Sequence, residues 1–328
     1  MSRKCEVSFS SASKFFQLFC DVRKILPFSR TMPVYGFSLP SQCPICHPRR
    51  ASACRCEDKP ALKRVLRAVR VVHAIGLTVL EGVNCEDILR VNFKTENNGD
   101  RFLERHLRPG SSPVIGFDIY PLPAQLQETK NSFLKRAVLS TSQCDFLVAV
   151  LGEALAALLG QDVDESAEVL VNAKSIYRPR LVQGHVVKEQ GVTSHNALAF
   201  WLKIEDIPVI FDPSSAQFGN NKPVYVLPRM GEGASDHFTA VLGIRALGTT
   251  LRDVAKNDPQ YAEWAAAIEC LVHSAVFTGP SNFSPRWPDY VSQLDLPEDE
   301  FEARLAAALL DLSTRAVPAF LGQWRSTH

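Results

Sequence analysis

The chain has 328 residues, of which 46% are hydrophobic and 22% are charged. These proportions are typical of a globular protein with an ordinary core, and they exclude general disorder and fibrous repeats. The net charge of +1 conceals an uneven distribution, because residues 1–70 hold 14 basic and 4 acidic side chains, against 22 and 31 in the remainder. A basic segment before a mildly acidic body predicts either an anionic partner or a sorting signal for that segment.

The first 59 residues form a basic, cysteine-rich arm, which we expect to be poorly ordered and distinct from one α+β domain over 60–328. Four thiols in the arm could ligate zinc, namely Cys43, Cys46, Cys54 and Cys56. Their C-x-C half-site is no standard zinc spacing, so uncoordinated thiols are favoured and no cofactor is expected. The absence of a secretory h-region and the few body cysteines predict a reducing, intracellular and mainly cytoplasmic location. Organellar targeting by the basic N-terminus is the alternative.

Helical spacing begins at Pro60 and places Leu62, Leu66 and Val69 on one face. Up to residue 124 we then expect short helices at Asp87–Phe93 and Asp100–Leu107, separated by a turn at Asn97–Gly99. A strand is expected at Val114–Tyr120. Basic side chains on the first helix could touch phosphate, but no aromatic residues interleave with them. A solvated helix face is therefore favoured over a nucleic-acid site.

In the middle of the chain the sequence pattern changes from one typical of helices to one typical of strands. We expect helices at Gln125–Val138 and Asp145–Leu159, then strands at Glu168–Ala173, Leu181–Lys188, Asn196–Lys203 and Val209–Asp212. From residue 223 to 328 the pattern predicts helices, at Thr249–Ala255, Gln260–Val276 and Glu298–Arg315. The fold class is therefore α+β, with helices on either side of an antiparallel sheet. No stretch has the roughly 20 mostly apolar residues of a membrane span.

Three residues in chain order carry a pattern of nucleophilic chemistry: Cys144 at the start of an apolar helix, His195 at the start of a strand and Asp212 at the end of the next. Ser142 is the expected N-cap, with Asp145 reaching back toward it. The first turn of a helix stabilises a thiolate, because its unpaired N–H groups and the helix dipole attract negative charge. A histidine could accept the thiol proton, and a carboxylate could orient the imidazole.

The stretches around these residues resemble the transglutaminase-like branch of the papain-like cysteine peptidase superfamily. They are Ser140–Cys144, His195–Leu202 and the most specific one, Asp212-Pro213-Ser214-Ser215-Ala216-Gln217-Phe218. The resemblance implies a papain-like core over about residues 125–222 with flanking helices. It also implies that Cys144 is the nucleophile, His195 the general base and acid, and Asp212 the orienting acid. The implied activity is acyl transfer on a protein or peptide substrate, which covers proteolysis, deamidation and transamidation.

A catalytically inactive scaffold that acts in binding is the alternative, and two features favour it. Asp145 places a negative charge next to the thiol. A two-residue turn at Glu205-Asp206 would pair Ala199 with Asp212, which leaves His195 about 13 Å away along the strand.

Individual residues have plain alternatives as well. Asp212 could cap an Asx-type turn, and His185 is a rival base. Trp201 is more consistent with a core residue than with a substrate platform. Gln217–Gly219 is interpreted as structural, with Phe218 in the core and Gly219 in a turn.

Overall fold

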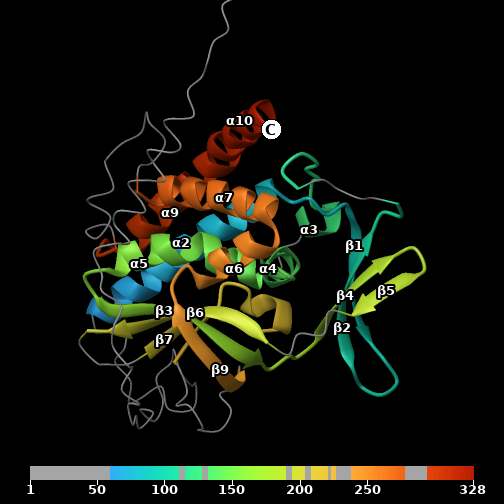
Figure 1. Ribbon diagram of the computed structural model, residues 1–328, viewed down its shortest axis with the longest axis horizontal. Helices are drawn as coiled ribbons and strands as arrows, with labels where there is room; N and C mark the ends of the chain where they lie inside the picture. Colours follow the sequence, from blue (N-terminus) through green and yellow to red (C-terminus); the bar gives the residue numbers. More distant parts are fainter. Residues whose placement is uncertain are drawn as a thin grey trace, which may run out of the picture. The chain divides into compact units, whose positions relative to one another are not determined.

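The computed structural model describes residues 60–110, 115–127, 132–189, 194–203, 208–220, 223–226, 238–277 and 294–328 (Figure 1). The arm, with the four cysteines considered for zinc, lies outside these ranges. Among the residues that are described, no group of three or more His, Cys, Asp or Glu side chains is arranged to hold a metal ion.

The fold is α+β, as predicted, and its larger sheet is antiparallel with the strand order β8-β7-β6-β3-β9. Its strands are β3 (Val163–Ala173), β6 (His195–Leu202), β7 (Pro208–Phe211), β8 (Val224–Val226) and β9 (Phe238–Ala246). The last two strands correct the expectation that residues 223–328 are wholly helical. Strand β9 lies at the sheet edge and only Phe238 of it is fully buried, so its sequence lacks a clear alternation.

Helices α2 (Pro60–Gly82), α5 (Cys144–Leu159) and α7 (Pro259–Phe277) cover one face of this sheet, as Figure 1 shows. Helix α5 is the centre of this layer, because eleven of its residues are buried. The expected helix over 125–138 is instead split into α3 (Ala124–Gln127) and α4 (Ser132–Ser140). Helices α4 and α5 meet at an angle of 100°. The bend places the start of α5 at the corner of the helical layer.

A second, four-stranded sheet has the order β1-β2-β4-β5, and its β2–β4 pair is parallel. The strands are β1 (Ile88–Thr95), β2 (Arg101–Leu107), β4 (Arg178–Gln183) and β5 (Val186–Glu189). Strands β1 and β2 occupy the residues for which two short helices were expected, so those predictions were wrong. The turn at Gly99 between them was predicted correctly. Consecutive residues of β2 are buried, which hides the alternation typical of strands.

Two other strand expectations were also wrong. The predicted strand Leu181–Lys188 is a hairpin, which turns at Gly184 with a φ of 60°. Residues 115–120, expected as a strand, form a turn and irregular backbone.

The C-terminal residues form one continuous helical rod of α9 (Glu298–Asp311), a π-helical turn at Leu312–Ala316 and α10 (Val317–Thr327). Among the described helices, this rod alone is long and apolar enough, by length and composition, to cross a membrane. Charged residues interrupt its apolar residues. Its inner side packs on the body, where Trp324 contacts Trp264 with ring centroids 4.9 Å apart.

Arginines of α2 hold the region before and within α9. Arg64 pairs with Asp295, and with Asp162 before β3, and Arg70 pairs with Glu298 and Glu302. Arg67 is buried and donates to the carbonyl groups of Leu294 and Leu296. The arginines that were considered for phosphate contact, and expected to be solvated, are thus engaged in internal ion pairs and hydrogen bonds.

Candidate active site

The register between β6 and β7 determines where His195 lies relative to Asp212. Ala199 pairs with Ile210 and Leu198 with Phe211. If this register continues, Asp212 lies opposite Ala197, two residues from His195 rather than the four that the sequence arithmetic gave. Residues two apart on a strand point to the same face, so the two side chains are diagonal neighbours. The expected turn at Glu205-Asp206 lies outside the described residues.

His195 and Asp212 form a buried hydrogen-bonded pair. The distance from His195 Nε2 to Asp212 Oδ1 is 2.8 Å, and each residue is only 1% exposed. Burial by itself lowers the pKa of His195, but the charge and hydrogen bond of Asp212 raise it, and the Cys144 thiol contributes in the same direction. The balance raises the pKa of this imidazole from 6.5 to about 10. The imidazolium form is therefore favoured at neutral pH.

Asp212 also forms the Asx-type turn that was its plain alternative. Its Oδ1 accepts from the Ser214 backbone N–H at 3.0 Å while it contacts His195. His73, a buried histidine of α2, contacts the Pro213 carbonyl at 3.0 Å. Burial lowers the pKa of His73 to about 4, so this histidine is neutral and donates to the carbonyl. The turn after β7 is thus fixed by two histidines, His195 through Asp212 and His73 through the Pro213 carbonyl.

Cys144 is the first residue of α5, and its thiol is partly exposed. The thiol contributes to the raised pKa of the His195 imidazole. Within the described residues, however, His195 Nδ1 is buried without a hydrogen bond of normal geometry. Catalytic hydrogen bonds are often long in the absence of substrate. Because α5 begins here, the Cys144 N–H has no acceptor within the helix.

The turn before Cys144 differs from the expected cap. The N-cap is Gln143, without a side-chain cap bond, and Ser142 has a φ of 61°. This left-handed conformation costs about 1–2 kcal/mol in a residue other than glycine. Gln217 stabilises it, because its Oε1 accepts from the Ser142 N–H at 3.0 Å. Sequence reasoning missed this role of Gln217; the signal was a polar side chain next to the buried Phe218.

The stretch around Gln217 has the structural role that was predicted for it. Phe218 is buried, and its ring contacts that of His195 with centroids 4.7 Å apart. Gly219 has a φ of 93°, and a Cβ atom there would lie 2.6 Å from that of Ile176. Trp201 is buried in an apolar cluster, as expected of a core residue. His185, the rival base, lies exposed in the β4–β5 turn.

Asp145 contacts the thiol directly. The distance from Cys144 Sγ to Asp145 Oδ1 is 3.5 Å, and Asn196 Nδ2 donates to the same oxygen at 2.6 Å. Arg245 on β9 donates in turn to Asn196 at 2.8 Å. A chain of polar side chains therefore runs from the sheet edge to Cys144. Neither Asn196 nor Arg245 stood out in the sequence, because each contacts the site only through the paired strands.

Replacing Asp145 by Asn is expected to speed alkylation of Cys144 by iodoacetamide about fivefold at pH 7. The aspartate repels the thiolate, and two charges about 4 Å apart in water interact by about 1 kcal/mol. Rates measured by mass spectrometry check this result. The same substitution at Asp299, an exposed residue at the start of α9, is the control and leaves the rate unchanged. An unchanged or slower rate in Asp145→Asn would contradict the electrostatic role.

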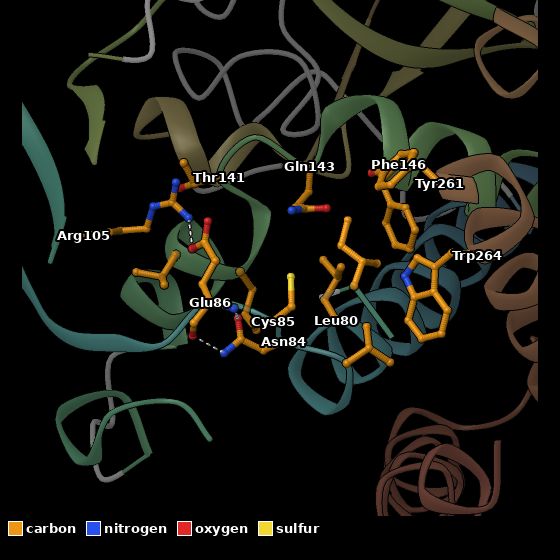
Figure 2. Close-up of a pocket in the computed structure, with 14 residues that line it drawn as sticks. Leu80, Asn84, Cys85, Glu86, Arg105, Thr141, Gln143, Phe146, Tyr261 and Trp264 are labelled. Carbon is orange, nitrogen blue, oxygen red and sulfur yellow. Dashed lines mark hydrogen bonds and ion pairs between the residues drawn. The ribbon is translucent and has the colours of Figure 1, made fainter. Parts of the chain in front are cut away.

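A cavity of about 90 Å³ adjoins the turn before Cys144. Figure 2 shows Gln143 on one side of it and the sulfur of Cys85 pointing into it. Aromatic and aliphatic side chains line one end, and an ion pair between Glu86 and Arg105 lies at the other. Thus a small, mainly apolar space lies beside the candidate nucleophile.

Comparisons of this chain with protein-family models, with curated proteins and with solved structures found no match. In this site His195 contacts Asp212, and the Cys144 thiol contributes to the raised pKa of the imidazole.

Proposed function

We propose that the chain is a cysteine-nucleophile enzyme that transfers acyl groups through a thioester at Cys144. The observation that carries the proposal is the buried His195–Asp212 pair beside a thiol at the start of α5. A transglutaminase-like core fits this order of residues. A protein or peptide is the proposed substrate.

In the proposed reaction the Cys144 thiolate attacks a carbonyl carbon, and a bond forms between sulfur and carbon. The Cys144 backbone N–H stabilises the oxyanion that develops. The C–N bond then breaks, and the departing amine takes the proton held by the His195 imidazolium. Water or an amine attacks the thioester and gives a proton to His195, the sulfur–carbon bond breaks, and the Cys144 thiolate is regenerated beside the imidazolium. Water gives hydrolysis or deamidation, and an amine gives transamidation.

Acetylation by para-nitrophenyl acetate tests this proposal at the level of single thiols. Cys85 and Cys270 are free cysteines of the same chain, and burial raises the pKa of each, so they serve as internal controls. We expect Cys144 to be acetylated at least about a hundredfold faster than either, because His195 assists only this thiol. Peptide mass spectrometry after short exposure measures the three rates. Equal rates at all three thiols would overturn the proposal.

A non-catalytic binding scaffold is the second candidate, and the contact between Cys144 and Asp145 favours it. The thiol donates its proton to this carboxylate in a hydrogen bond rather than to His195. The same experiment distinguishes the two, since a scaffold predicts no preferred acetylation at Cys144.

A further inference from the structure

The cavity beside the Cys144 turn has an apolar end and a polar end (Figure 2). The apolar end is lined by side chains from α2, α5 and α7: Leu80, Phe146, Tyr261 and Trp264. At the polar end, Arg105 is paired with Glu86, and Asn84 donates to the carbonyl groups of Glu86 and Tyr120. These polar groups are thus bound to protein partners. A ligand in this cavity would therefore be stabilised mainly by burial of apolar surface at the apolar end.

Two lining residues connect the cavity to the candidate nucleophile. Gln143 directly precedes Cys144 in the chain, and its side chain borders the cavity. Tyr261 borders it from α7; burial raises the pKa of its hydroxyl, and so do nearby groups that include Asp145, Cys85 and Cys144. The cavity therefore borders the residue that directly precedes the candidate nucleophile.

The size of the cavity restricts what it can hold. An apolar cavity of about 150 Å³ accommodates benzene. One of about 90 Å³ accommodates roughly three or four carbon atoms on the same scale. Branched aliphatic groups of the valine and leucine type have this size, whereas an aromatic ring exceeds it.

We infer that this cavity is the acyl-side specificity pocket and takes a branched aliphatic group of the substrate. The inference rests on the proposed function, and it adds the class of acyl donor to it. Each added carbon that enters the pocket loses its contact with water, which stabilises the acylation transition state.

The test compares acylation of Cys144 by para-nitrophenyl esters of acetate, 3-methylbutanoate and phenylacetate. We expect the 3-methylbutanoyl ester to react at least about tenfold faster than either of the others, relative to their uncatalysed rates. Val83→Phe narrows the cavity and is expected to bring the ratio of the first two rates near one. Val187→Phe, the same change at an exposed residue of β5, is the control and keeps the ratio.

A second variant and a binding measurement cover the remaining outcomes. Leu80→Ala enlarges the cavity and is expected to shift the preference toward phenylacetyl, which tests the pocket if Val83→Phe fails to fold. Binding of 3-methylbutanamide to Cys144→Ala, followed by NMR of the Trp264 indole, tests the pocket without acylation. Acylation of Cys144 with no preference among the esters overturns the pocket and leaves the proposed function intact. A shift of the Trp264 signal without acylation of any thiol supports the pocket and overturns the function.

Discussion

Asp212→Asn is expected to lower acyl transfer at Cys144 by roughly 10²–10⁴-fold at neutral pH. The substitution keeps an oxygen that can accept from the Ser214 N–H, so the turn after β7 is preserved. What it removes is the charge that keeps His195 protonated against the cost of burial. A buried neutral imidazole has no proton for the departing amine, and the asparagine can also orient the ring in the wrong tautomer.

The pH dependence of this variant follows from the raised pKa of His195. In the wild-type chain the imidazolium loses its proton as the pH rises through about 10, so we expect activity to fall there. The proton also stabilises the folded state: the contribution is complete below about pH 6.5 and is lost between that value and about 10. In Asp212→Asn burial lowers the pKa of His195 below 6.5, so the loss of its proton moves below neutrality and protonation now destabilises the folded state as the pH falls. Rates and urea unfolding at pH 6, 8 and 10 would show the shift.

His195→Gln provides the control for this prediction. If the two side chains act as one unit, the double variant is no slower than the slower single variant, within about threefold. Fully additive losses would mean that Asp212 acts independently of His195. Activity of Asp212→Asn within threefold of the wild type would remove Asp212 from the mechanism.

Arg67→Met is expected to lower the free energy of unfolding by about 3 kcal/mol. Arg67 is 5% exposed, donates to the carbonyl groups of Leu294 and Leu296, and lies over the ring of Phe301 at 4.7 Å. Methionine preserves most of the apolar volume but leaves both carbonyl groups without their charged donor, at about 1.5–3 kcal/mol for each hydrogen bond. Urea unfolding measures the change.

Arg70→Met is the matched control on the same helix. Arg70 is half-exposed and pairs with the exposed carboxylate of Glu298 and the partly exposed one of Glu302. Such surface pairs contribute about 0–1 kcal/mol. Equal losses in the two variants would show that burial of Arg67 does not determine its contribution.

The sequence predicted the structure best for elements with a simple burial pattern, such as the long helix α5, most of whose residues are buried. The apolar run of α5 predicted the helix and its start near Cys144 almost to the residue. Strands β6 and β7 were predicted with bounds within one residue of those observed. Their ends position His195 and Asp212, and for this reason the candidate site could be assembled from the sequence.

Other features depended on distant contacts that no local pattern carries. The helical spacing of β2 arises because Phe102 and Leu103 are both buried, on opposite faces of a central strand. The cap at Ser142 was wrong because Gln217, from a different segment, holds that residue in a left-handed conformation. The register error came from an assumed turn length, which displaced the partner of Ala199 by two residues.

The hydrogen bond from the Ser142 N–H to Gln217 joins positions 75 apart in the chain. During synthesis the cysteine therefore leaves the ribosome long before the segments that align it. Asp212 itself donates its backbone N–H to Pro223, so its placement depends on β8 as well. A nascent or truncated chain that ends before this strand carries the thiol but lacks the segment that fixes the position of Asp212. Under the proposed function, the reactivity of Cys144 therefore appears only when translation has passed the last of these segments.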